Sequence, residues 1–321
     1  MIGTGLFLKE WKQNKAVIFL LWLVLVVEVP FRIWSAYSSH LQLLKLNQPV
    51  DPVFAFNFSH NSFIGISMYA LIIFPILQLG IERSRGTFDF SLSLPYSRRR
   101  LFMTKWLNGV LSIIIPVLIS YLLSAAIFQF THAKVTGFHD YYLLYPSCLL
   151  MFYTLIFAAG CLTGTSFAQG LVAFSVMVLP VLFFTLLMAN VNVFTHGASY
   201  IELDNQYKWV LKYSPSNSLI FNGEGFASPV VPLVYTVIFS LIAYFSFVKQ
   251  PIERNGYFFL WKGINHPVQI IVILLGVMGF GSAGYSFSSG QYYGYFIGVL
   301  IGAAIGLAIG YFLIYQKFKI N

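Results

Sequence analysis

The residues best suited to chemistry are charged side chains gathered in one short stretch, residues 81–106. Its sequence is "IERSRGTFDFSLSLPYSRRRLFMTKW", with six basic and two acidic residues between two long apolar runs. Guanidinium and ammonium groups bind carboxylates and phosphates, and carboxylates accept hydrogen bonds from N–H donors. This composition predicts ion pairing and anion recognition rather than catalysis.

The middle of the stretch fits two kinds of secondary structure. Apolar and polar residues alternate from 88 to 94, which is typical of a strand. A helix would instead place Phe88 and Leu92 on one side and Phe90 and Leu94 on the other, as suits a short helix between the membrane and a partner. Pro95 is expected to end either element.

A second helix is expected to begin after Pro95, with Ser97 as its N-cap. Arg98, Arg99 and Arg100 would then occupy its first turn, where the helix dipole disfavours each cation by about 0.3–1 kcal/mol. Three arginines in a locally unfavourable position indicate an external anion. Lipid phosphate at the inner leaflet and an acidic surface on a protein partner both satisfy this requirement.

The composition of the whole chain predicts an all-α integral membrane protein. Of 321 residues, 58% are hydrophobic and only 9% are charged, whereas soluble domains carry about 25% charged residues. Runs of about 18 or more apolar residues are candidate membrane spans. We identify about eight transmembrane helices, at residues 16–36, 63–80, 107–130, 145–166, 170–190, 229–248, 267–285 and 294–316.

The distribution of basic residues predicts the orientation of these spans. Fourteen lysines and arginines fall on the side of the N-terminus and four on the other, so the positive-inside rule places both termini in the cytoplasm of a multi-pass cell-membrane protein. The net charge of +9 is therefore mostly topogenic, and no nucleic acid partner is expected. The cytoplasmic set is Lys9, Lys12, Lys15, Arg83, Arg85, Arg98, Arg99, Arg100, Lys105, Lys249, Arg254, Lys262, Lys317 and Lys319, and the outer set is Lys45, Lys134, Lys208 and Lys212.

Two features lie inside the expected spans. Glu28 and Arg32 are four residues apart, a spacing that allows an ion pair on one helix, although intramembrane charges also contact polar substrates or partner helices. In the last span every fourth residue is glycine, which permits close helix packing, either within the chain or against another subunit. These glycines are Gly294, Gly298, Gly302, Gly306 and Gly310.

No enzymatic motif is present in the sequence. It contains no G-x-x-x-x-G-K-[ST], H-E-x-x-H or G-x-S-x-G pattern, so the chain is not expected to bind ATP through a P-loop or to be an enzyme. No catalytic residue, metal site or cofactor of its own is predicted. Any energy source must therefore come from another subunit.

The charged stretch resembles the cytoplasmic loop of ABC-2-type permeases, the membrane subunits of one class of ATP-binding-cassette exporters. The family pattern is acidic-basic-x-x-Gly-Thr-x-acidic, then an apolar segment, Pro-x-Ser-Arg and a lysine seven residues later. The resemblance implies a short coupling helix, rather than a strand, that docks on a separate ATPase subunit, which would bind ATP and Mg. Carried over residue by residue, the ATPase-facing candidates are Glu82, Arg83, Gly86, Thr87, Asp89, Pro95, Ser97, Arg98 and Lys105.

Other segments are similar to the family in position. Residues 6–15 resemble its interfacial elbow helix, and the outer segment 191–228 resembles its re-entrant helices. The resemblance implies a permease core over 1–250 with six spans, followed by a cytoplasmic linker and two additional spans over 251–321. The size and layout are similar to the Ytr-type permeases of Bacillus-like bacteria.

The function expected from this resemblance is export of an amphiphile, peptide or cell-envelope-related compound, driven by a cytoplasmic ATPase. A second permease subunit, identical or paralogous, and the lipid bilayer are the other expected partners. Two alternatives remain open at this point: an ion-gradient-driven transporter that uses Glu28 as its ionisable switch, and a membrane scaffold or sensor that transports nothing.

Overall fold

A computed structural model of the chain describes residues 4–58, 65–93, 95–195, 209–210, 212–216, 228–251, 254 and 256–312. Within these ranges, eight helices are long and apolar enough to cross a membrane. The all-α membrane fold predicted from composition is therefore confirmed, and each expected span overlaps one of these helices.

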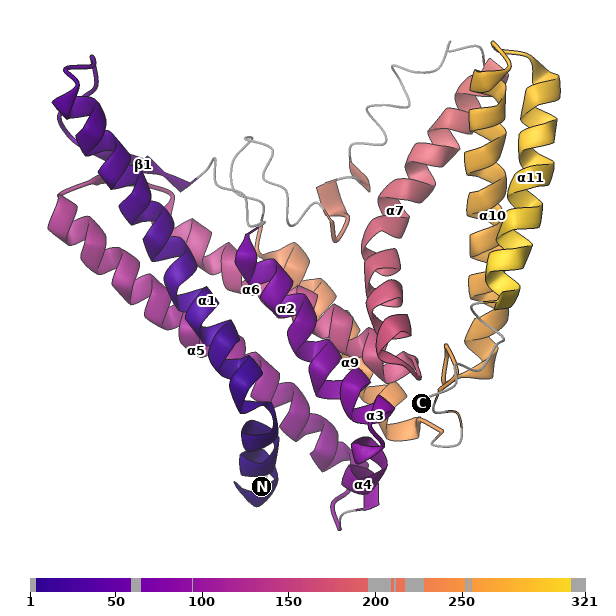
Figure 1. The fold of residues 1–321 in the computed structure, drawn as a ribbon, viewed down its shortest axis with the longest axis horizontal. Coiled ribbons are helices and arrows are strands. Elements are labelled where there is room, and N and C mark those ends of the chain that lie inside the picture. The colour runs from indigo at the N-terminus through magenta and orange to yellow at the C-terminus, as the bar shows by residue number, and fades with distance from the viewer. Residues whose placement is uncertain are drawn as a thin grey trace. The chain divides into compact units, whose positions relative to one another are not determined.

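Ten α-helices and one π-helical segment form most of the described chain (Figure 1). The second span is compound, because α2 passes into a π-helical segment, η2, and then into α3. In chain order the elements are α1 (Thr4–Lys45), α2 (Ile66–Pro75), η2 (Ile76–Ile81), α3 (Glu82–Ser84), α4 (Thr87–Ser93), α5 (Arg98–Thr131), α6 (Phe138–Leu162), α7 (Ser166–Thr195), α9 (Val230–Lys249), α10 (Lys262–Phe287) and α11 (Tyr292–Gly310).

The expected elbow helix is not separated from the first span. Residues 6–15 form the beginning of α1, which continues without a break for 42 residues, or about 63 Å at 1.5 Å per residue. No glycine or proline occurs between Leu6 and Val29, so nothing in the sequence interrupts the helix there. At this length α1 exceeds the hydrocarbon core of a bilayer, which is about 30 Å thick.

The chain divides into two compact units. Unit 1 comprises Met1–Leu79, Phe90–Ala158 and Ser218–Val248, and unit 2 comprises Gly80–Asp89, Ala159–Asn217 and Lys249–Asn321. This division groups α7 with the last two helices, so it does not follow the expected boundary at residue 250. That boundary remains a prediction about the extent of the family core.

In unit 1, α1 packs against α5 and α2. At the end opposite the N-terminus, two short strands pair in parallel, β1 (Ala55–Asn57) with β2 (Lys134–Thr136). Phe58 lies beside them and is almost fully buried against the rings of Phe128 and Tyr141. Neither strand is predicted by the sequence, because three-residue segments are too short to show an alternating pattern.

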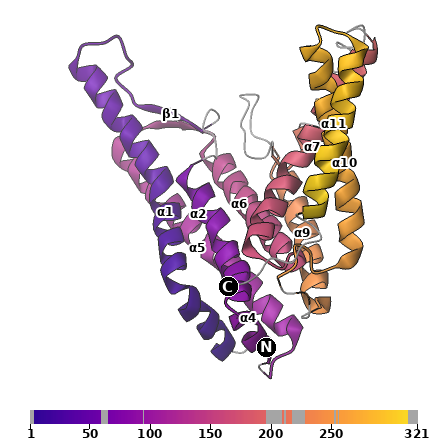
Figure 2. The same cartoon turned by 45° about the vertical axis from the view of Figure 1, so that its right-hand side comes forward.

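In unit 2, the glycine stripe of α11 faces α10, and all five of its glycines are buried. A Cβ atom at Gly302 would collide with the carbonyl oxygen of Gly276, and one at Gly298 would collide with that of Phe280. A helix of the same chain, α10, thus packs against the stripe. Figure 2 shows α10 and α11 running side by side.

One asparagine joins α7 to this hairpin. Asn190 Nδ2 donates to the Met278 carbonyl oxygen at 2.9 Å, and the Tyr295 hydroxyl donates to Asn190 Oδ1 at 2.9 Å. Interhelical hydrogen bonds of this kind stabilise helix packing in lipid by about 1 kcal/mol. Close backbone contact therefore joins α10 to α11, and Asn190 joins α7 to both of them.

The close packing of the glycine stripe predicts that a larger side chain there will destabilise the protein. Gly302→Leu should separate α10 from α11 and destabilise the protein by about 1–3 kcal/mol, as overpacking does in well-packed cores. Ala304→Leu is the matched control, because Ala304 lies on the exposed side of the same helix. Thermal unfolding of both variants in detergent measures the difference, and equal midpoints would contradict the packing role of the stripe.

Candidate functional site

The charged stretch folds into two short helices and the start of a long one. The helical prediction for its middle is confirmed by α4, and the strand alternative is wrong. Gly86 forms the turn between α3 and α4 with φ of 70°, a conformation that favours glycine. Ser97 caps α5 as expected, with its side chain accepting from the Arg100 backbone N–H.

Glu82 and Arg83 lie inside the protein. Each is 3% exposed, because α3 continues the second span and keeps both side chains among helices. Arg83 donates to the Gly160 carbonyl oxygen at 2.8 Å and to Gln250 Oε1 at 3.0 Å, both within unit 2. The expectation that these two residues face a partner does not match their burial.

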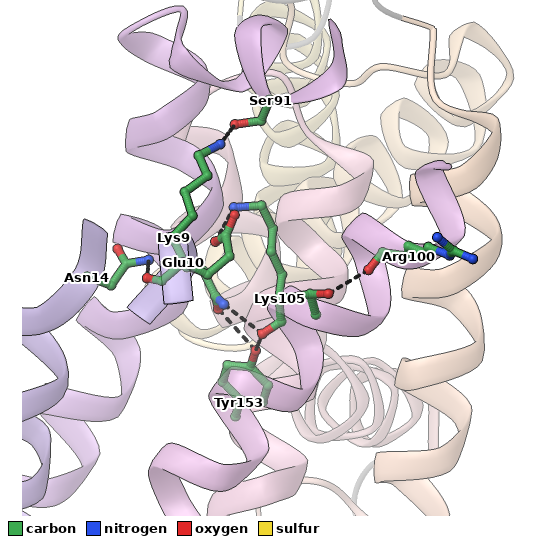
Figure 3. A network of polar contacts seen from close by, with 9 residues as sticks. Lys9, Glu10, Asn14, Ser91, Arg100, Lys105 and Tyr153 are labelled. Carbon is green, nitrogen blue, oxygen red and sulfur yellow. Dashed lines mark hydrogen bonds and ion pairs between the residues drawn. The ribbon is translucent and has the colours of Figure 1, made fainter. Parts of the chain in front are cut away.

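Lys105 is also buried, and its partner is an acidic residue at the start of α1. Lys105 Nζ lies 2.7 Å from Glu10 Oε2, and the two side chains are 1% and 0% exposed (Figure 3). Gln78 Nε2 donates to the Lys105 carbonyl oxygen at 2.7 Å, and Tyr153 Oη donates to Gln78 Oε1 at 3.0 Å. Lys105 therefore points into unit 1 rather than toward a docking partner.

The start of α1 also holds α4. Lys9 Nζ donates to Ser91 Oγ at 2.9 Å and lies 5.7 Å from the centre of the Phe90 ring. Figure 3 shows this contact beside the Glu10–Lys105 pair. Neither Lys9 nor Glu10 is predicted as a site residue from the sequence. The one sequence feature that points to them is their position in a short charged segment before an apolar run.

The remaining loop residues differ in exposure. Arg98 is partly buried and donates to the Val248 carbonyl oxygen at 3.2 Å, near the C-terminus of α9. Phe90 is 64% exposed although Phe88 and Ser91 on the same helix are buried. Among the other loop residues whose exposure the structure describes, the exposed ones are Arg85, Gly86, Ser93, Pro95, Ser97, Arg99, Arg100 and Met103.

Parts of the expected site lie outside the described residues. The side chains of Thr87 and Asp89 belong to this group, and so does most of the segment 191–228. Their proposed roles remain predictions.

Glu28 and Arg32 form an ion pair within α1. Glu28 Oε2 also accepts from the Ser67 backbone N–H at 2.8 Å, in the first turn of α2. The carboxylate thus joins α1 to the beginning of the second span. This geometry matches the structural interpretation of the pair, while contact with a substrate or partner helix remains a prediction.

A cavity of about 250 Å³ lies between α5 and α6 in unit 1. Its polar groups include Tyr121 and His139, whose Oη and Nδ1 atoms are 3.3 Å apart. The lining is mostly apolar and consists of Ile114, Val117, Leu118, Tyr121, His139, Tyr142, Leu143 and Pro146.

Comparison with known proteins confirms the family that the loop pattern indicated. Residues 62–251 match the model of the ABC-2 family transporter protein. The chain is 40% identical over 328 residues to the probable ABC transporter permease YtrD of Bacillus subtilis and 38% identical over 332 residues to the probable ABC transporter permease YtrC of the same organism. Each comparison covers 100% of both chains, and no solved structure matches. The chain therefore belongs to the ABC-2 family and is a multi-pass ABC transporter permease subunit.

Proposed function

We propose that the chain is the membrane subunit of an exporter driven by a separate cytoplasmic ATPase, which docks on the loop 81–106. The observation that carries this proposal is Phe90, a largely exposed aromatic residue on a helix that is anchored through the buried side chains of Phe88 and Ser91. Phe88 and Ser91 hold the inner side of α4, while Phe90 projects from it.

The exposed residues of the loop suit a protein partner. Interfaces are enriched in aromatic residues and arginine, and a few aromatic anchors in pockets supply most of the affinity. A groove on the ATPase surface would receive Phe90, as grooves receive short amphipathic helices elsewhere. Arg99 and Arg100 are exposed at the start of α5 and suit acidic groups, either on that surface or in the inner leaflet.

The sequence indicates which subunit of the transporter would bind ATP. The chain has no P-loop motif, so ATP and Mg would be bound by the partner. Closure of an ATPase dimer would displace the loop and rock the spans. A second permease subunit, identical or paralogous, would supply the other half of the pathway in the cell membrane, with both termini of this chain in the cytoplasm.

The cavity between α5 and α6 supports an amphiphilic substrate. Its apolar lining suits a hydrocarbon portion, and Tyr121 with His139 offers hydrogen bonds to a polar group. We propose an amphiphile, a peptide or a cell-envelope-related compound as the exported class.

The docking role of Phe90 is tested by truncation. Phe90→Ala should weaken binding of the cytoplasmic ATPase subunit about thirtyfold, because losing an interface hot spot costs about 2 kcal/mol. Co-purification of the ATPase with the permease measures this loss. Phe130→Ala is the matched control, because Phe130 is 90% exposed near the opposite end of α5. Equal recovery of ATPase with both variants would refute the docking role of Phe90.

The orientation is tested with thiol labels. Cys148 and Cys161 are buried, so single introduced cysteines should dominate labelling by an impermeant reagent. Arg85→Cys should react only after the membrane is opened, because the loop is expected in the cytoplasm. Lys134→Cys in β2 should react in intact cells. Labelling of position 85 from outside would overturn the orientation and ATPase docking together.

A further inference from the structure

We propose that Arg83 is a positioning residue that carries movement of the docking loop into the ends of the spans without touching the ATPase itself. This inference rests on the proposed function and assigns Arg83 a task different from docking. Arg83 lies one residue after the compound second span enters α3, and it is 3% exposed.

The guanidinium group of Arg83 joins segments that are far apart in the sequence. Nη1 donates to the carbonyl oxygens of Gly160 and Thr163, and Nη2 donates to Gln250 Oε1 at 3.0 Å. Gly160 lies in the last turn of α6, whose final carbonyl groups lack partners within the helix. A cation there also complements the negative end of the helix dipole.

The same group contacts the loop helix. The guanidinium carbon lies 4.9 Å from the centre of the Phe88 ring in α4, within the range of a cation–π interaction. Arg83 therefore contacts α4 and the end of α6 at once. A displacement of α4 would be transmitted through this side chain.

The segment that accepts these hydrogen bonds is also paired with the residues that precede α10. Thr163 pairs with Phe259 in an isolated antiparallel bridge, and the Leu260 backbone N–H donates to the Leu162 carbonyl oxygen at 2.9 Å. Phe259 and Leu260 come directly before α10. The end of α6 is thus attached to the entry of α10, which extends the path from the loop to the C-terminal helices of unit 2.

The backbone preceding Arg83 is closely packed as well. A Cβ atom at Gly80 would lie 2.8 Å from Ser166 Cα at the beginning of α7, and one at Gly160 would lie 2.6 Å from Gln169 Nε2. At Gly80 the near atom belongs to the backbone, so a larger residue there would force the two segments apart. The chain entering the loop therefore has little freedom to move independently of α6 and α7.

Arginine is chemically better suited to this task than lysine. The planar guanidinium offers several N–H donors in fixed directions, so one side chain serves three acceptors and stacks on a ring. An ammonium group keeps the charge without that fixed geometry. Arg83→Lys should therefore be a partial replacement, and Arg83→Gln should lose both the charge and most of the contacts.

The test uses the complete permease–ATPase complex in proteoliposomes. In Arg83→Gln we expect ATPase recovery within about twofold of the unsubstituted complex. The kcat of ATP hydrolysis per complex should fall about tenfold, and the KM for ATP should stay unchanged, because about 1.4 kcal/mol of coupling is removed while nucleotide binding is not touched. Arg83→Lys should restore part of kcat.

Two further variants keep the test decisive. Lys262→Gln removes an exposed cation from unit 2 and should change neither kcat nor ATPase recovery. Gln250→Ala removes one acceptor while keeping Arg83, and it should also lower kcat. This variant provides the test if Arg83→Gln is too unstable to assemble.

The possible outcomes separate this inference from the proposed function. Loss of ATPase recovery in a folded Arg83→Gln permease would make Arg83 a docking residue and overturn the inference. Full kcat in Arg83→Gln, or in Gln250→Ala where the first variant does not assemble, would also overturn it. Failure of the unsubstituted permease to recover any ATPase would instead refute the proposed function.

Discussion

A charge buried in a membrane protein must be paired, and this requirement organises the end of the molecule that carries the N-terminus. Lys105 and Glu10 are almost completely buried and 2.7 Å apart. Removing one member of such a pair typically costs about 3–5 kcal/mol, because the other is left unpaired away from water. The sequence around them must therefore keep the start of α1, the π-helical part of the second span and α5 together. Gln78 and Tyr153 extend this network to α6.

The same rule explains which loop residues remain available to a partner. Arg83 donates to acceptors inside unit 2, and Arg98 donates to a carbonyl oxygen near the end of α9. Lys9 donates a hydrogen bond to Ser91 on α4. Phe90, Arg99 and Arg100 are left exposed. A loop that is fixed at its base and exposed at its tip can transmit force, whereas a fully solvated basic loop could bind a partner without moving the spans.

Features set by local chemistry were predictable from the sequence. The spans follow from apolar runs, Ser97 from the chemistry of N-caps, and the glycine stripe from its period of four. Choosing a helix for 87–93 required family resemblance, because both periodicities fitted the same residues. These predictions depend on neighbours within a few positions along the chain.

Pairings across long sequence distances were not predictable. Glu10 and Lys105 are 95 residues apart, and Arg83 reaches an acceptor 167 residues away. No spacing rule connects such residues, and the family resemblance alone predicts that Glu82, Arg83 and Lys105 face a partner. The burial of these three side chains does not match that expectation. The β1–β2 pair was missed for a related reason, since its two strands are short and lie in separate connections.

The measurement that tests the central claim most directly is a double-mutant cycle on Glu10 and Lys105. Unfolding free energies in detergent would be compared for Glu10→Gln, Lys105→Met and the double variant. We expect each single change to destabilise the permease by about 3–5 kcal/mol, and the double variant to lose far less than the sum, because no unpaired charge remains. Strictly additive losses, or single variants as stable as the unsubstituted protein, would show that this buried pair does not hold the base of the loop.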